Sequence, residues 1–108
     1  DNGRVIAVNY SVSSTEDRIR VFELINDVWT QKGSDIIEPN NFNHTIIKIS
    51  NNGNDILFNA INTSSSILAA KIYRYTYISN NWDISYNFTP QNAKDIYFTA
   101  SSDLSLML

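Results

Sequence analysis

The sequence predicts an all-β protein of β-propeller-type blades: two four-stranded antiparallel repeats of about fifty residues, followed by a partial third. Three observations predict this class. Short segments rich in Ile, Val, Tyr and Phe alternate with runs of Asn, Gly and Ser, as is typical of strands and turns. No window shows the 3.6-residue period of an amphipathic helix. The order of strands and turns recurs along the chain at a nearly constant spacing.

The recurrence divides the chain into units. The aligned segments, at offsets of 50 to 53, are 2–8 with 52–58, 45–50 with 95–100, 21–24 with 72–75, and Trp29 with Trp82. We therefore expect a first repeat at about 1–42 that lacks its first strand, a second at about 43–92, and a partial third at about 93–108.

Each repeat should contain up to four strands. The expected strands are 4–9, 18–25 and 28–32 in the first repeat, 45–50, 55–60, 68–78 and 82–88 in the second, and the two segments 95–100 and 103–108 in the third. Asn52-Gly53 between two apolar runs predicts a type I′ hairpin, in which both central residues have positive φ. The best helical candidate, 15–26, contains the alternating stretch 18–22 and is therefore assigned to a strand.

Composition excludes several classes of function. The net charge is −3, and the four Lys and four Arg are scattered, so no phosphate-binding surface is expected and nucleic acid is excluded as a partner. No apolar run is long enough to span a bilayer, so we expect no membrane insertion. The absence of cysteine excludes disulfides and thiolate metal sites.

The sequence indicates no catalytic residues, no metal site and no cofactor. The single histidine, His44, falls between two units, where a solvated loop histidine is expected. The close acidic groups, Glu16-Asp17 and Asp35 with Glu38, are also expected in loops. The segment 51–55 has only one carboxylate and forms a tight turn, which favours a turn over a calcium loop.

Aromatic side chains are the candidate ligand-binding residues. Trp29 and Trp82 follow equivalent turns, where each indole is interpreted as a packing anchor between blades, with a sugar-binding platform as the alternative. Tyr73, Tyr75 and Tyr77 share one strand face, where an interblade stripe is favoured over an exposed patch. Asn side chains near the second turn complete the alternative sugar site. The candidates are Trp29, Trp82, Tyr73, Tyr75, Asn80 and Asn81.

The segments 1–8 (DNGRVIAV), 18–23 (RIRVFE) and 29–36 (WTQKGSDI) resemble the propeller repeats of the integrin-α-like, FG-GAP-related kind. Such repeats occur in large surface proteins and in some giant-virus proteins. The resemblance implies a propeller fold, partners that are further blades or other copies of the chain, and a location at a cell surface, outside the cell or in a virus particle. The chain departs from the pattern in lacking the calcium loop that many such blades carry.

Three functions remain open. We expect a non-catalytic interaction or structural module, with propeller blades in a surface or particle-associated assembly. One alternative is lectin-like carbohydrate binding, with glycans as the ligands and one site per repeat. The other alternative is a β-sandwich domain of a viral or secreted structural protein.

Overall fold

The computed structural model describes residues 4–14, 16–39, 42–61, 70–88, 99–100 and 106–107. Every regular element among them is a β-strand, so the all-β prediction is confirmed. Three expected features lie partly or wholly outside the described residues: the start of the chain at 1–3, the first two residues of the expected strand 68–78, and most of the partial third repeat. No helix in the described part of the chain is long and apolar enough to cross a membrane.

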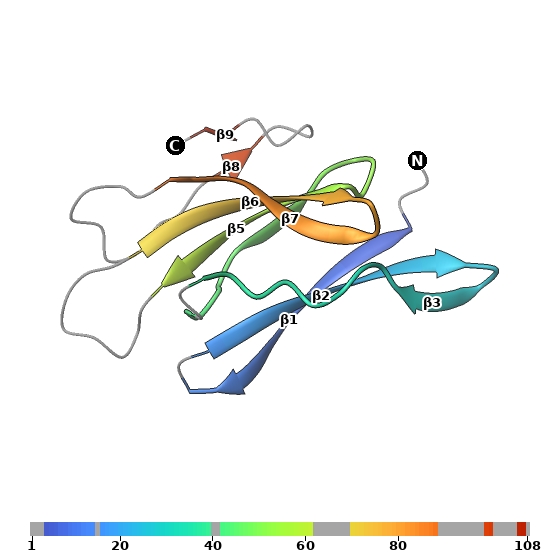
Figure 1. The fold of residues 1–108 in the computed structure, drawn as a ribbon, viewed down its shortest axis with the longest axis horizontal. Coiled ribbons are helices and arrows are strands. Elements are labelled where there is room, and N and C mark those ends of the chain that lie inside the picture. The colour runs from blue at the N-terminus through green and yellow to red at the C-terminus, as the bar shows by residue number, and fades with distance from the viewer. Residues whose placement is uncertain are drawn as a thin grey trace.

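The first sheet contains three antiparallel strands in the order β1 (Val5–Ser13), β2 (Glu16–Ile25) and β3 (Val28–Gln31) (Figure 1). The assignment of 18–25 to a strand and not to a helix is therefore confirmed. Along β2 the side chains of Asp17, Ile19 and Val21 are buried and the intervening ones are partly exposed, which is the period of two that a half-buried strand requires. This alternation determines which face of the sheet enters the core.

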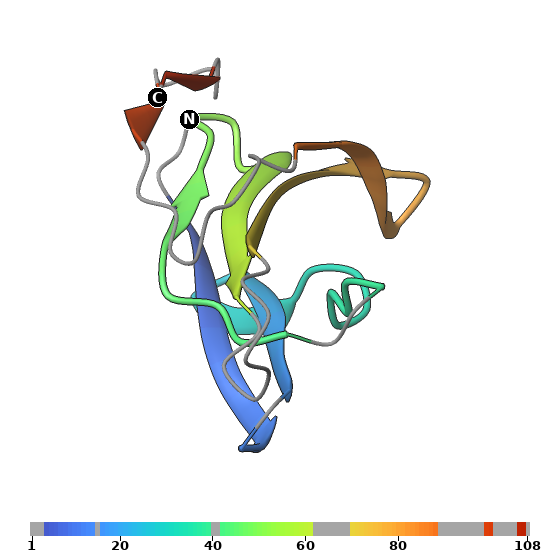
Figure 2. The same ribbon diagram turned by 90° about the vertical axis from the view of Figure 1, so that its left-hand side faces the viewer.

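The second sheet contains four antiparallel strands in sequence order, and a third, two-stranded sheet lies beyond it, on the side away from the first (Figures 1 and 2). Every residue from Ile56 to Ile61 is buried, so the central strand of the second sheet is covered on both faces. The strands are β4 (Ile47–Ile49), β5 (Asp55–Ile61), β6 (Ala70–Ile78), β7 (Asn81–Phe88), β8 (Thr99–Ala100) and β9 (Leu106–Met107).

The first two sheets have corresponding registers. Each β1–β2 pair from Val5↔Glu23 to Ser11↔Asp17 has an equivalent pair between β5 and β6. The equivalent is found by adding 50 to the residue number in β1 and 53 to the residue number in β2. Adding 53 to both partners of each β2–β3 pair likewise gives a pair between β6 and β7. The sequence alignment of 21–24 with 72–75, at an offset of 51, differs from this register by two residues. Because side chains alternate with a period of two along a strand, this error leaves every side chain on its correct face.

Two hairpins have the two-residue turns in which both central residues have positive φ. Asn26 and Asp27 (φ 51° and 65°) join β2 to β3, and Ser79 and Asn80 (φ 54° and 68°) join β6 to β7. These are the geometries of type I′ turns, which match the twist of the flanking strands.

The type I′ prediction for Asn52-Gly53 is wrong. Of these two residues only Gly53 has positive φ (72°), and the backbone N–H of Gly53 donates to the Ser50 carbonyl at 3.0 Å. The Asn52 Oδ1 atom accepts from the Asn54 N–H at 2.9 Å, which forms an Asx turn. Ser50 donates its backbone N–H to the Asp55 carbonyl across the hairpin, and four residues lie between this hydrogen-bonded pair, too many for a two-residue turn.

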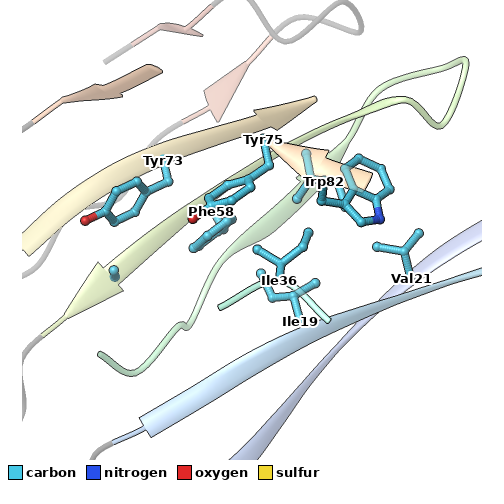
Figure 3. Close-up of a cluster of buried hydrophobic side chains, with 9 residues drawn as sticks. Ile19, Val21, Ile36, Phe58, Tyr73, Tyr75 and Trp82 are labelled. Atoms are coloured by element: carbon cyan, nitrogen blue, oxygen red, sulfur yellow. The ribbon is translucent and has the colours of Figure 1, made fainter. Parts of the chain in front are cut away.

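The first two sheets pack face to face around one apolar cluster (Figure 3). Ile19 and Val21 of β2, together with Ile36 from the segment after β3, point toward the aromatic side chains of the second sheet. That segment is held against β2 by reciprocal backbone hydrogen bonds between Ile19 and Ile36 (3.1 and 2.7 Å). The second-sheet members of the cluster are Ile56, Phe58, Ala60, Tyr73, Tyr75 and Trp82.

Candidate functional site

Trp82 lies at the junction of the first two sheets. Its side chain is only 7% exposed, and the indole Nε1–H donates to the backbone carbonyl of Lys32 at 2.7 Å. The backbone at Gly33 approaches the ring closely: a Cβ atom at that position would stand 2.9 Å from Trp82 Cδ1. The indole of Trp82 is therefore an anchor between sheets, and its faces are not available to a sugar ring in this structure.

Lys32 completes this junction from the other side. Its ammonium group donates to the Gly53 carbonyl and to Asn54 Oδ1, both at 2.8 Å, and lies 4.9 Å from the centroid of the Tyr77 ring. The lysine thus joins the segment after β3 to the β4–β5 turn, with a cation–π contact to the β6–β7 hairpin. The sequence analysis did not single out Lys32, because its partners are a backbone carbonyl and an amide oxygen in a turn more than 20 residues away.

Tyr73 and Tyr75 are buried beside Phe58, with ring centroids 5.7 and 5.6 Å from that of Phe58. Burial raises the pKa of Tyr75 to about 12, so its hydroxyl is neutral at physiological pH. Asn80 lies in the β6–β7 turn and accepts a hydrogen bond from the Tyr77 hydroxyl at 3.2 Å, while Asn81 is exposed at the start of β7. Of the six candidate ligand-binding residues, Tyr73, Tyr75 and Trp82 are thus interior and the rest are at the surface.

The prediction that His44 is a solvated loop residue is wrong. The side chain is 5% exposed, its ring packs edge-on against Phe58 at a centroid distance of 4.7 Å, and Nδ1 lies 2.9 Å from Asn9 Oδ1. Burial lowers the pKa of His44 to about 4, against an opposing effect of the Asp17 carboxylate. The Nε2 atom is buried without a hydrogen-bond partner. The backbone N–H of His44 donates to Asp17 at 2.8 Å, and this hydrogen bond holds the backbone where the ring points into the interior.

The expectation that Glu16 and Asp17 lie in a loop is also wrong, because both belong to β2. Burial acts to raise the pKa of Asp17, but hydrogen bonds from Asn9, Ser11, Asn43 and the backbone of His44 outweigh it and lower the pKa. The carboxylate of Asp17 therefore organises the segment that leads into β4, and its neighbours are amides and a hydroxyl that hydrogen-bond it.

The second acidic group, Asp35 and Glu38, lies outside the strands as expected, and each carboxylate has its own structural partners. Arg20 forms a two-pronged ion pair with Asp35 (2.8 and 3.0 Å), and the Tyr10 hydroxyl donates to the same carboxylate at 2.6 Å. Hydrogen bonds from Arg20 hold the pKa of Asp35 well below its ordinary value. Glu38 is fully buried and accepts the backbone N–H of Phe42. Within the described residues, no three His, Asp or Glu side chains are grouped so as to hold a metal ion.

An apolar patch lies on the outward side of the first sheet, beside Arg20 and Gln31, and we call this patch the open face. It consists of Ile6, Val8, Phe22, Leu24 and Trp29, which share one side because Ile6 pairs with Phe22, Leu24 pairs with Trp29, and faces alternate along each strand. Ile6 is 44%, Val8 42% and Trp29 48% exposed. Large apolar side chains gathered on one face mark an interaction surface more often than singly scattered ones do.

The register places a covered counterpart of this face in the second sheet. The five corresponding residues, which we call the covered face, are Ile56, Phe58, Tyr75, Tyr77 and Trp82. Four of them are buried in the cluster between the sheets and Tyr77 packs against it. The first sheet covers this face with Ile19, Val21 and Ile36 (Figure 3). Trp29 and Trp82 therefore occupy equivalent positions in two different environments.

Comparison with known proteins identified no relationship: no family model, no curated protein and no solved structure matches the chain. The candidate site is thus defined by the geometry of the chain alone, as an exposed apolar sheet face with a buried equivalent.

Proposed function

We propose that the chain is a non-catalytic structural or interaction module, with sheets that are propeller-type blades stacked in one direction in a surface or particle-associated assembly. The observation that carries the proposal is the pair of equivalent faces. The covered face of the second sheet packs on the opposite face of the first, and the first sheet presents the same five positions to solvent. Repetition of one packing step along a chain is the way in which blades are joined.

A two-layer sandwich accounts less well for this burial. In a sandwich, each sheet buries one face and turns a polar face to water, so its strands alternate in burial. The β5 strand is instead buried at six successive positions, Ile56 to Ile61, and the outward face of the first sheet carries the five apolar residues of the open face. Burial of successive positions is expected of a sheet within a stack, and an exposed apolar surface is expected of the sheet at the end of one.

Binding without catalysis is supported by the hydrogen-bond partners of the titratable residues. A nucleophilic site needs a base within reach of a hydroxyl or thiol. The Nδ1 atom of His44 instead faces the Asn9 side chain, and Asp17 is surrounded by amide groups, a Ser11 hydroxyl and a backbone N–H. These groups fix the position of the segment before β4.

Carbohydrate binding is supported less well by the surroundings of the exposed indole. Of the two tryptophans, Trp29 has the accessible ring. Beside it on the open face lie Leu24 and Phe22, and the nearby amide of Gln31 already donates to Asp35 at 2.8 Å. Sugar recognition needs hydrogen-bonding groups beside the aromatic ring, because hydroxyls left unpaired on burial are costly. A glycan array probed with the chain and with Trp29→Ser tests this alternative, which requires a signal that the substitution removes.

The blade proposal is tested by extending the stack. A chain in which residues 1–50 are duplicated in series should fold with the added sheet covering the open face of the original one. We expect one cooperative urea transition with a larger m-value than that of the natural chain, because m increases with the surface exposed on unfolding. Two separate transitions, one of them at the midpoint of the natural chain, would contradict the proposal.

A further inference from the structure

We propose that the outer edge of β1 binds an extended peptide segment of a partner protein, which adds to the first sheet as an antiparallel strand. The equivalent edge of the second sheet already carries such a strand, β4 (Ile47–Ile49). The inference goes beyond the proposed function, because it concerns the edge of one sheet and not the faces by which sheets stack.

The backbone of β1 directs hydrogen-bonding groups away from its sheet. The Arg4 carbonyl accepts the Leu24 N–H at 2.9 Å, so these two residues form a hydrogen-bonded pair just before β1 begins. Because such pairs alternate along an antiparallel ladder, Val5, Ala7 and Asn9 turn their N–H and C=O groups to the side opposite β2. Of the strands that the structure describes, none pairs with β1 on that side. A row of unpaired backbone groups is a template for a further strand.

The equivalent groups of β5 hold β4 in place. Their residues, found by adding 50 to each residue number in β1, are Asp55, Leu57 and Asn59. The Asp55 carbonyl accepts the Ser50 N–H at 3.0 Å, and the Asn59 N–H donates to the Ile46 carbonyl at 3.2 Å. The outward groups of the same strand position are thus satisfied by a strand in the second sheet and open in the first.

The residue pattern of β4 defines the chemistry of the bound segment. Ile47 and Ile49 lie on one side of the strand and pack against the cluster between the sheets, and Lys48 between them is exposed. In the same register on β1, the two isoleucine positions stand opposite Val8 and Ile6 of the open face. The added strand should therefore carry apolar, β-branched side chains at alternate positions, whose cross-strand contacts add to the backbone hydrogen bonds.

A folded second copy does not offer such a segment from the matching position. Its β4 is already paired with β5 and is not free to add to another sheet. The fitting partner is instead a segment that is extended and unpaired before it binds. Addition of such a segment to an exposed sheet edge is a general mode of peptide recognition, in which the main chain supplies the affinity and alternate side chains the specificity.

The test uses the natural chain and a synthetic peptide that copies residues 44–51. Calorimetric titration should show saturable binding of one peptide per chain. Two N-methylated peptides are the matched probes: in the β4 register the Lys48 N–H faces the partner strand, and the Ile49 N–H faces away from it. N-methylation at Lys48 should raise the dissociation constant by about tenfold or more, and N-methylation at Ile49 should change it by less than about twofold.

Amide hydrogen exchange followed by NMR locates the bound peptide. In the free chain the N–H of Ile6 and Val8 should exchange slowly because it bonds to β2, and the N–H of Ala7 should exchange rapidly. The peptide should slow the exchange of Ala7 and Asn9. Their equivalents in β5 should be protected equally with and without the peptide, because β4 stays in place.

Four outcomes would overturn the inference. The first is no binding at millimolar peptide, and the second is an equal loss of affinity for the two N-methylated peptides. The third is loss of protection at Leu57, which would mean that the peptide replaces β4 in the second sheet. The fourth is a dimer of the free chain with a protected Ala7 amide, which would make a second copy the occupant. None of these bears on the stacking of the sheets, which the unfolding of the chain with duplicated residues 1–50 tests separately.

Discussion

The contact between Gly33 and Trp82 allows a quantitative prediction about the junction of the two sheets. Gly33 has φ +75°, and a Cβ atom there would lie 2.9 Å from Trp82 Cδ1, 3.0 Å from Trp82 Nε1 and 3.1 Å from Tyr77 Cε1. In Gly33→Ala, the left-handed backbone costs about 1 to 2 kcal/mol, and overpacking against buried rings costs about 1 to 3 kcal/mol. We therefore expect a loss of about 2 to 5 kcal/mol in the free energy of unfolding.

A double-mutant cycle separates the two contributions. Trp82→Phe removes the pyrrole atoms that the new methyl group would meet, so the added cost of Gly33→Ala should fall to the backbone part plus the remaining contact with Tyr77. Urea denaturation followed by circular dichroism measures all four proteins of the cycle. A Gly33→Ala chain within about 0.5 kcal/mol of the natural one, the range of an ordinary surface substitution, would refute the packing of this segment against the indole.

Two further predictions concern buried polar groups. Burial lowers the folded-state pKa of His44 from 6.5 to about 4, so the unfolded chain takes up this proton first as the pH falls. Stability should thus be complete above pH 6.5 and decline by about 3 kcal/mol as the pH falls to 4, measured by urea titrations at each pH; an unchanged slope in His44→Gln would contradict the assignment. Lys32→Met should lower stability by about 2 to 3 kcal/mol because the Gly53 carbonyl and Asn54 Oδ1 lose a charged donor. An equal loss in Lys32→Arg, which keeps a charged donor, would instead indicate a steric cause.

Local signals account for the success of the strand predictions. Alternation of apolar and polar side chains at 18–25, and a short apolar run after a turn at 55–60, are decided within a few residues, so these expected strands nearly coincide with β2 and β5. The type of turn was predicted less well than the strands. Asn52-Gly53 has the composition of a type I′ turn, but the separation of the flanking strands sets the number of loop residues, and that separation is not encoded in the dipeptide.

The candidate site could be predicted only in part, because burial depends on neighbours that are distant in sequence. Trp29 and Trp82 follow equivalent turns, and nothing local distinguishes the exposed indole from the buried one. His44 was misplaced for the same reason, since its burial follows from a hydrogen bond to Asp17, 27 residues away. Lys32 binds a backbone carbonyl, a partner that leaves no trace in side-chain patterns.

The central claim is that one sheet face is repeated and requires a neighbouring sheet to cover it. Acrylamide quenching of a single tryptophan tests this directly in the chain with duplicated residues 1–50, where both Trp82 and the Trp29 of the added unit are replaced by Phe. At concentrations where the protein is monomeric, the remaining Trp29 should be protected from acrylamide as well as Trp82 is in the natural chain. Quenching as strong as that of Trp29 in the natural monomer would contradict the account.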